Sequence, residues 1–287
     1  MPLPTLARPF ALFAAMTGIL IGGLACTTQV ANGVSTGGSG GGGGGAGTGG
    51  HPECSKNADC TGELQICRRD EGRCVGLLSE RCTRVTGTSD DGWKDDSAVI
   101  FGYLLPASGP DQDLGRAQEG ALALALHEIA ATDGLPAPDQ THRRPLVLVG
   151  CDDGPNEDQP TAAAKHLVDI GVPAIIGHAF SGATLQIATE VTMPAGVLLF
   201  SPSATNPAIS TLSDQDLVWR TALPDPAQTA ALIGYLPTLD QAIRARYALS
   251  PADPIKVAVV HNGDTYGATL ADALQAKLSF NGATATA

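Results

Sequence analysis

Aromatic and basic residues are scarce in this chain of 287 residues. Only 4% of the residues are aromatic, and Lys plus Arg total 17 against 29 Asp plus Glu, which gives a net charge of −12. Few aromatic side chains provide no platform for stacking nucleic-acid bases. A net negative charge repels phosphate groups. We therefore expect no nucleic-acid partner.

Enzyme and metal motifs are also missing. The six histidines are scattered, and His127-Glu128 lacks the second His of a zinc-protease helix. Each histidine is interpreted as a surface or internally satisfied residue. Ser181 stands in Phe-Ser-Gly rather than in the Gly-x-Ser-x-Gly turn of hydrolases. We expect no catalytic residue, no metal and no cofactor, so the chain is not predicted to be an enzyme.

The acidic run CDDGPNEDQ, residues 151–159, could suggest a cation site. Its carboxylates lack the ordered spacing of an EF-hand calcium loop. We therefore interpret this run as a solvated loop.

The first residues have the features of an export signal. Arg8 precedes an uncharged apolar run over residues 10–24, which is too short for a comfortable membrane span. The ending Gly-Leu-Ala-Cys resembles a bacterial lipobox, so residues 1–25 are expected to be a lipoprotein signal peptide and Cys26 the lipidated residue. An ordinary signal peptide that contains a chance cysteine is the alternative. Residues 26–50 are Gly-rich and predict a flexible linker to the membrane.

A cysteine-rich segment follows over residues 51–82. With Cys26 set aside, six of the seven cysteines remain, an even number that indicates disulfides in an exported chain. They are Cys54, Cys60, Cys67, Cys74, Cys82 and Cys151. Zinc is disfavoured because no C-x-x-C pair occurs. We favour two bridges among the first four and a Cys82–Cys151 bridge by elimination, although sequence alone does not fix the connectivity.

From residue 98 the pattern alternates between strands and helices. Apolar runs predict strands at 99–105, 146–149, 174–176 and 197–200, and helical spacing predicts helices at 114–131, 161–170 and 183–191. Strands that are apolar on both faces are typical of a parallel sheet covered by helices. We therefore predict an α/β lobe with a doubly wound parallel sheet over residues 96–225. A helix at 227–247, a strand at 256–260 and a helix at 266–278 predict part of a second α/β lobe over 226–287.

Three loops follow predicted strands of the first lobe and are rich in Ser, Thr and Gly. They lie at 104–115, 175–186 and 199–208. In such sheets ligands bind beyond the carboxyl ends of the strands. Ser181 falls where a helix is expected to begin, and its hydroxyl and the neighbouring free amides favour an anion. These loops predict a site for a small carboxylate.

Three stretches resemble one family of binding proteins. They are VIFGYLLPASGPDQDLGRAQEGALALALHEI, VPAIIGHAFSGATLQIATEVTMPAGVLLFSPSATNPAIS and IKVAVVHNGDTYGATLADAL. Over residues 98–287 the chain is similar to periplasmic binding proteins of the Leu/Ile/Val type, also called the type I or ligand-binding-receptor fold. The resemblance implies two α/β lobes that close on an amino acid or a related small ligand. It also implies later strands that this chain does not contain, so the second lobe is expected to be incomplete, as in a fragment or a truncated product.

The resemblance also implies a set of ligand-binding residues. These are Ser181, Ser203, Thr205, Asp225 and Tyr266. Ser181 and Thr205 would hold the ligand carboxylate through hydroxyl and backbone amide. Ser203, by its backbone carbonyl, and Asp225 would face the ammonium group, and Tyr266 would reach in from the second lobe.

Simpler roles exist for the same residues. Ser181 and Asp225 could be helix caps, Thr205 a turn residue, and Tyr266 a packing residue. Leu114 departs from the family, which often has an aromatic residue over the ligand at this position.

Three functions are consistent with these features. The first is a lipid-anchored, exported binding protein, periplasmic or at the cell surface, that serves an ABC-type amino-acid importer with a permease as partner. The second is a sensory receptor module of the same fold, and the third is a structural or interaction lipoprotein that binds no ligand.

Overall fold

The computed structural model describes residues 53–154, 159–280 and 283–284. The predicted signal peptide, Cys26 and the Gly-rich linker lie outside these ranges. None of the helices within them is both long and apolar enough to cross a membrane.

A six-stranded sheet forms the centre of the molecule, with the order β10-β9-β8-β4-β7-β3. Its parallel strands are β4 (Val99–Leu105), β7 (Leu146–Asp152), β8 (Ala174–Gly177), β9 (Leu198–Ser201) and β10 (Val218–Arg220). The chain passes from β4 to β7 on one side and then crosses to β8 on the other. This is the predicted doubly wound lobe. Strand β3 (Cys82–Gly87), which we did not predict, pairs antiparallel with β7 at the edge.

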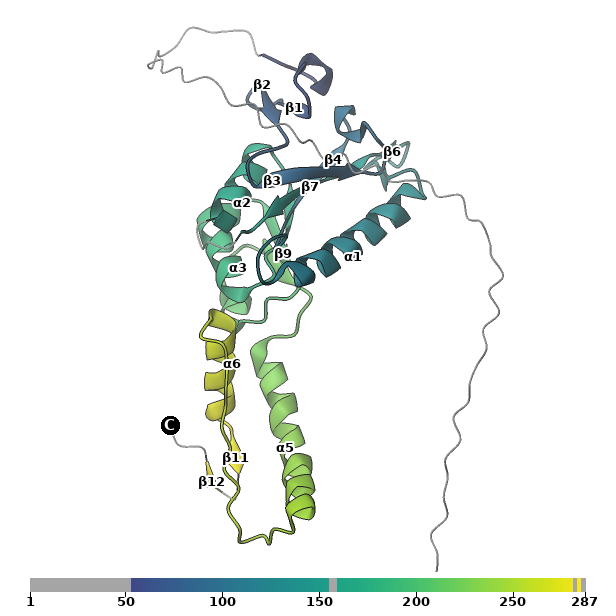
Figure 1. Cartoon of the computed structure of the whole chain (residues 1–287). Helices are drawn as coiled ribbons and strands as arrows, with labels where there is room; N and C mark the ends of the chain where they lie inside the picture. Colours follow the sequence, from purple (N-terminus) through teal and green to yellow (C-terminus); the bar gives the residue numbers. More distant parts are fainter. Residues whose placement is uncertain (1–52, 155–158, 281–282, 285–287) are drawn as a thin grey trace, which may run out of the picture.

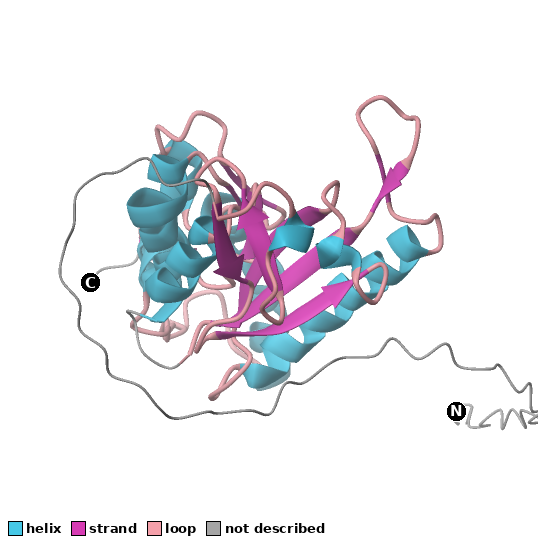
Figure 2. Cartoon of the chain, turned by 90° about the horizontal axis from the view of Figure 1, so that it is seen from above, coloured by secondary structure: helices cyan, strands magenta, loops and turns pink. Residues whose placement is uncertain are grey.

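Helices cover both faces of this sheet (Figures 1 and 2). Helix α1 (Gln112–Ala130) lies on one face, and α2 (Gln159–Asp169) and α3 (Ser181–Ile187) lie on the other. A π-helical turn at Ala188–Thr192 and α4 (Met193–Ala195) continue α3, and Gly196 at φ 68° ends the helix. Both sides of the strands are therefore removed from water, as their continuous apolar sequences require.

The cysteine-rich segment belongs to the same hydrophobic core as the sheet. Strands β1 (Gln65–Arg68) and β2 (Arg73–Gly76) form a hairpin, and Ile66, Val75 and Leu77 join the core cluster that contains residues of β4, β7 and β8. The segment thus packs against the lobe and shares its hydrophobic core.

Three disulfides hold this segment: Cys54–Cys67, Cys60–Cys74 and Cys82–Cys151. The last of these is the bridge expected by elimination, and it joins β3 to β7. The sulfur atoms of Cys54, Cys60 and Cys74 lie within 4.8 Å of one another. They do so because two disulfides pack together, and a sulfur in a disulfide is not a thiolate ligand for a metal.

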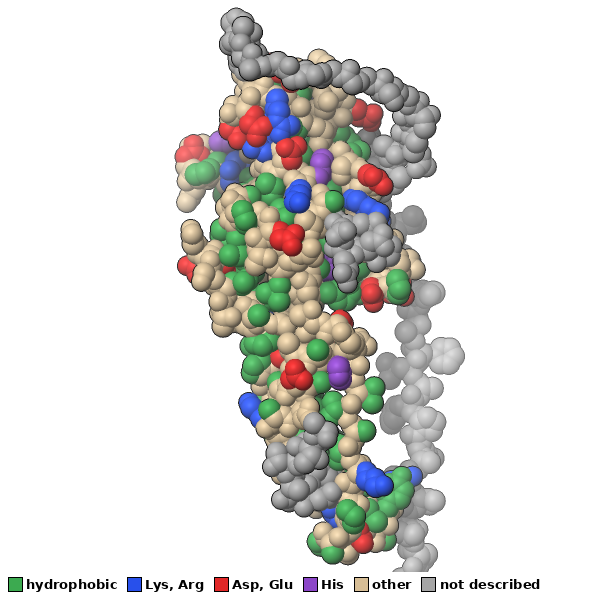
Figure 3. Space-filling model, turned by 90° about the vertical axis from the view of Figure 1, so that its left-hand side faces the viewer, with side chains coloured by type: hydrophobic (Ala, Val, Ile, Leu, Met, Phe, Trp, Pro, Cys, Tyr) green, Lys and Arg blue, Asp and Glu red, His purple; other side chains and the backbone are tan. Residues whose placement is uncertain are grey.

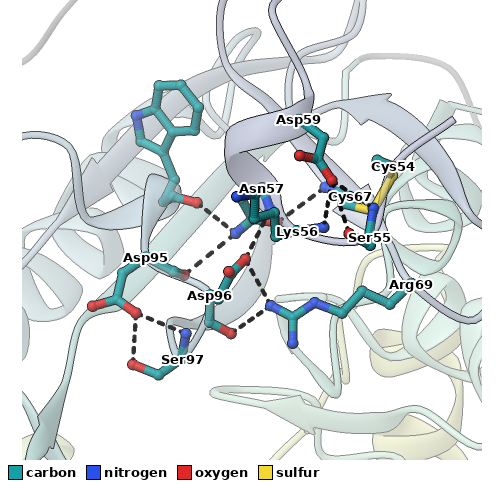
Figure 4. A network of polar contacts seen from close by, with 11 residues as sticks. Cys54, Ser55, Lys56, Asn57, Asp59, Cys67, Arg69, Asp95, Asp96 and Ser97 are labelled. Atoms are coloured by element: carbon teal, nitrogen blue, oxygen red, sulfur yellow. Dashed lines mark hydrogen bonds and ion pairs between the residues drawn. A yellow bond between two sulfur atoms is a disulfide. The ribbon is translucent and has the colours of Figure 1, made fainter.

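Asn57 connects the cysteine-rich segment to the chain just before β4 (Figure 4). Its side-chain amide donates to the carbonyls of Trp93 (3.0 Å) and Asp95 (3.3 Å), and its Oδ1 accepts from the Cys67 amide (3.0 Å). The Asn57 backbone N–H donates to Asp96 Oδ1, which also pairs with Arg69. A single buried side chain therefore satisfies three backbone groups from two segments.

The remaining helices extend away from the lobe (Figure 1). Helices α5 (Asp225–Tyr247) and α6 (Thr265–Gln275) lie side by side. The segment that connects them in sequence runs back toward the lobe before α6 begins (Figure 1). The strand predicted at 256–260 is wrong, because these residues form no strand and Val260 is 92% exposed. An apolar run becomes a strand only when a neighbouring strand takes its hydrogen bonds, and no described strand pairs with these residues.

Short elements complete the described chain. They are β5 (Leu135–Pro136) with β6 (Arg143–Arg144), β11 (Ser279–Phe280) with β12 (Ala283–Thr284), and 3-10 turns at Asn57–Asp59, Gly92–Lys94 and Pro207–Thr211. Basic and acidic side chains lie next to one another near the upper end of the face in Figure 3. Ion pairs such as Arg68–Asp70 and Arg73–Asp169 belong to the cysteine-rich segment and the neighbouring end of α2.

We predict that Asn57→Ala lowers the free energy of unfolding by about 2 kcal/mol, because it leaves buried backbone groups without partners. Urea denaturation followed by circular dichroism measures this change. Asn262→Ala, at an exposed position, is the matched control and should change the stability little. Equal stability of the two variants would contradict the role assigned to Asn57.

Candidate functional site

The predicted ligand loops meet at the carboxyl ends of β4, β8 and β9. Strands β4 and β8 are neighbours in the sheet, and the chain leaves them toward opposite sides. The loops that follow such a pair diverge, and ligands of such sheets bind between loops placed in this way. The candidate site is therefore at the topological switch point of the lobe.

Ser181 and Thr205 are brought together here. Ser181 is the first residue of α3, and its Oγ accepts hydrogen bonds from the backbone N–H groups of Thr205 and Asn206, both at 3.2 Å. Ser181 is 2% exposed and Thr205 is 8% exposed. The loop after β8 and the loop after β9 are thus joined through one hydroxyl oxygen.

The side chain of Ser203 makes a second connection between the same loops. Its Oγ donates to the Ala179 carbonyl (2.8 Å) and accepts from Gln118 Nε2 (3.4 Å). Gln118 belongs to α1, so Ser203 also connects the ligand loop to the helix on the opposite face of the sheet. Leu114, one turn earlier on α1, is 40% exposed.

Two buried hydroxyls close to the crossover into α5 lack partners. Thr205 Oγ1 and Thr229 Oγ1 make no hydrogen bond within the described structure. A buried hydroxyl without a partner costs free energy. Thr205 therefore has a polar atom that a ligand or a shift of the loop can satisfy.

Asp225 is fully buried at the start of α5. Its N–H donates to the Thr205 carbonyl (3.0 Å), and its carboxylate accepts from Thr269 Oγ1 (3.0 Å) and from Gln228 Nε2 (3.4 Å). Thr269 belongs to α6, so the carboxylate faces that helix and not an open crevice. Tyr266, in the first turn of α6, is 38% exposed.

Helix α6 also contacts the ligand loop directly. Asn206 Nδ2 lies 3.4 Å from the Thr265 carbonyl and 3.3 Å from Thr269 Oγ1. The first turn of α6 therefore packs over the loop that contains Thr205. Any ligand that reaches Asp225 must displace this contact.

Arg220 is a charged residue of the site that we did not predict. Its Nη1 donates to the Asn206 carbonyl (2.7 Å), and its other nitrogen donates to the Ser210 hydroxyl. Burial lowers the pKa of Arg220, while the nearby Asp225 carboxylate opposes that shift. The only sequence signal was its place at the end of an apolar strand just before the crossover. Its positive charge favours an anion at the adjacent loop.

The acidic run at 151–159 is not a solvated loop where the structure describes it. Asp152 Oδ1 accepts from the backbone N–H groups of Ala107 (3.0 Å), Ser108 (3.1 Å) and Gly154 (3.2 Å). Asp153 is 3% exposed and lies 2.6 Å from His178 Nε2. Our interpretation was wrong for these two residues because their partners come from distant parts of the chain. Residues 155–158 lie outside the described ranges.

A cavity of about 480 Å³ lies elsewhere, between the cysteine-rich segment and the lobe. Its lining includes Asn57, Arg69, Val99 and Pro173. Val99 begins β4 and Pro173 precedes β8, so the cavity is at the amino ends of the strands. It is therefore at the opposite end of the strands from Ser181.

A family model described as "Periplasmic binding protein" matches residues 98–287. An "Amino acid binding protein" of Pseudomonas aeruginosa is 29% identical over 205 residues, which cover 71% of this chain and 49% of that protein. A "Leucine-specific-binding protein" of Salmonella typhimurium is 31% identical over 181 residues, covering 63% of this chain and 43% of that protein. The chain thus spans less than half the length of these relatives.

Among solved structures, the chain is similar to an ABC transporter substrate-binding protein of Desulfitobacterium hafniense in complex with Leu. The sequence identity is 25% and the TM-score is 0.49, over 66% of this chain and 49% of that chain.

We predict different effects on stability for two substitutions at the site. Ser181→Ala removes the acceptor of two buried amides and should lower the free energy of unfolding by about 1 to 3 kcal/mol. Thr205→Val removes a hydroxyl that has no partner, so the stability without added ligand should stay the same or rise. Urea denaturation of both variants tests this contrast. A loss of stability in Thr205→Val as large as that in Ser181→Ala would show that its hydroxyl is hydrogen-bonded.

Proposed function

Because the chain belongs to the periplasmic binding protein family over residues 98–287, we propose that it is an extracytoplasmic binding protein for a small α-amino acid. The observation that carries this proposal is the Ser181 hydroxyl held against the backbone amides of Thr205 and Asn206 at the switch point of the sheet. Hydroxyl and amide donors grouped in this way suit a carboxylate.

A ligand carboxylate would bind by competing with Ser181 for these amides. A carboxylate oxygen accepts stronger hydrogen bonds from N–H groups than a hydroxyl oxygen does. Once the amide of Thr205 donates to the ligand, the Ser181 O–H is free to donate as well. The unpartnered Thr205 hydroxyl adds a further donor at the same place.

The ammonium group of the ligand would be held on the side of Asp225. The carboxylate of Asp225 and the backbone carbonyl of Ser203 are the acceptors that such a group requires. Thr269 now occupies one oxygen of Asp225. Binding at this point therefore requires the first turn of α6 to move, which would also carry Tyr266 toward or away from the ligand.

Exposed apolar side chains on the first lobe favour an aliphatic ligand side chain. Leu114 is 40% exposed on α1 and Phe180 is 37% exposed just before α3. The names of the relatives include leucine and Leu/Ile/Val binding. We therefore choose L-leucine, L-isoleucine and L-valine as the first probes.

We further propose that Cys26 is lipidated and that the binding lobe is tethered to a membrane through residues 26–50. An ABC-type permease would then be the partner, as the family suggests. A sensory module of the same fold would bind the same ligands, and the genes beside this one would distinguish the two. A lipoprotein that binds no ligand remains the alternative outcome of the binding experiment.

We predict that L-leucine binds the exported chain with a dissociation constant of about 1 μM to 1 mM. Ser181→Ala and Thr205→Val should each weaken this binding by about tenfold or more, because each removes a donor to the carboxylate. Isothermal titration calorimetry measures the affinities. Thr211→Val, at an exposed hydroxyl, is the matched control. The absence of heat with all three branched-chain amino acids would contradict the proposal.

We predict that Cys26→Ser abolishes membrane anchoring, since the thiol is the acceptor of the lipid. Expression in a bacterium supplied with radiolabelled palmitate, followed by detergent phase partition, measures this. The wild-type chain should be labelled and enter the detergent phase. Equal labelling of the variant would rule out Cys26 as the modified residue.

A further inference from the structure

We infer that Asp153 and His178 form a buried positioning pair that sets the shape of the two loops around Ser181 and Thr205. The inference rests on the proposed function of that site. Neither residue belongs to the five ligand-binding residues predicted above. The pair makes no predicted contact with the ligand. It acts on the two loops through hydrogen bonds of the His178 ring and carbonyl.

The two side chains lie in contact away from solvent. Asp153 Oδ2 lies 2.6 Å from His178 Nε2, and the side chains are 5% and 4% exposed. The other ring nitrogen, Nδ1, accepts from the Phe180 backbone N–H at 3.0 Å. Because Nδ1 accepts from this amide, Nε2 is the nitrogen that bears the ring proton, and it lies against Asp153 Oδ2 in a close polar contact rather than an aligned hydrogen bond. Two partners therefore fix both the orientation and the tautomer of His178.

The backbone of His178 connects this pair to both ligand loops. Its carbonyl accepts from Thr184 Oγ1 (3.0 Å) in α3 and from Ser201 Oγ (2.6 Å) at the end of β9. Ser201 Oγ in turn accepts from the Ala204 backbone N–H (3.1 Å). A continuous set of polar contacts thus runs from Asp153 through His178 and Ser201 to Ala204, the residue that precedes Thr205.

The pair also orients an apolar wall of the site. The ring centroids of His178 and Phe180 lie 5.4 Å apart, and Phe180 is 37% exposed. Phe180 directly precedes Ser181. Its amide and its ring are therefore both placed by His178, whereas its outer face remains open to a ligand side chain.

Asp153 itself stands on a rigid part of the lobe. Its backbone N–H donates to the Leu105 carbonyl (3.2 Å), and Cys151, two residues earlier, is bonded to Cys82. Asp152, next to it, holds the loop after β4 through Ala107 and Ser108. The end of β7 thus contacts both the loop after β4 and the loop after β8.

Positioning predicts a loss of affinity that follows the polar contact between the two side chains and not the charge of Asp153. Asp153→Ala removes the polar partner of His178 Nε2, and it should weaken L-leucine binding by about tenfold. Asp153→Asn keeps an acceptor oxygen, and it should restore the affinity to within about threefold of the wild type. Asp139→Ala, which alters an exposed Asp–His pair, is the matched control and should bind as the wild type does. Calorimetry at 25 °C measures all four proteins.

Two measurements without ligand separate this inference from the proposed function. Long-range proton–nitrogen NMR spectra should show His178 protonated at Nε2 in the wild type and in Asp153→Asn. Amide hydrogen exchange at Phe180 and Ala204 should be about tenfold faster in Asp153→Ala, with exchange at Val149 in β7 unchanged. If the wild type binds no branched-chain amino acid, the proposed function fails while these measurements still test the pair.

Several outcomes would overturn the inference. These are wild-type affinity in Asp153→Ala, unchanged exchange at Phe180 and Ala204, or a His178 ring protonated at Nδ1. If Asp153→Ala does not fold, His178→Asn gives the same test, because its oxygen can replace Nδ1 but cannot reach Asp153. It should weaken binding by about tenfold with the Phe180 amide still protected, and wild-type affinity would again refute the pair.

Discussion

The hydrogen bonds from the amides of Thr205 and Asn206 to Ser181 Oγ are the constraint on which the site depends. Backbone N–H groups in a buried loop need acceptors, and a loop of small residues without regular structure has few of its own. Ser181 provides one acceptor for two of them, and Ser201 provides another for Ala204. The loop after β9 is therefore shaped by side chains from neighbouring strand ends, which makes the same atoms available to a ligand that accepts hydrogen bonds.

The lobe was predictable from sequence because its strands are apolar on both faces, as residues 99–105 and 174–176 illustrate. Local periodicity also located α5 and α6 to within a few residues. Periodicity carries no information on partners, and this explains the errors. The apolar residues 256–260 were expected to form a strand, but no described strand pairs with them. Asp152 and Asp153 were assigned to solvent because their partners lie about 25 to 45 residues away along the chain.

In the candidate site, too, the features set by local sequence were predictable and those set by contacts between distant segments were not. Ser181 and Thr205 were placed at the same end of the sheet by the resemblance and by the predicted strands that they follow, and the structure joins them through a hydrogen bond. The burial of Asp225 against Thr269 was not predictable, because it depends on how α6 packs on the first lobe. The extra strand β3 was missed for a similar reason. It covers the free edge of β7, and a covered edge is protected from pairing with another chain.

The contact of α6 with the ligand loop determines how binding and lobe arrangement are related. Thr269 bonds Asp225 while Asn206 bonds Thr269, so one helix turn holds groups that the proposed ligand also requires. An amino acid can shift this arrangement only by the difference in its affinity for the two states. The carboxylate of the proposed ligand would gain little from movement, because Ser181 and Thr205 belong to the first lobe. Its ammonium group would gain Asp225 only when α6 moves. Rearrangement of α6 would thus be driven by the ammonium group, and a simple carboxylate would bind the first lobe without it.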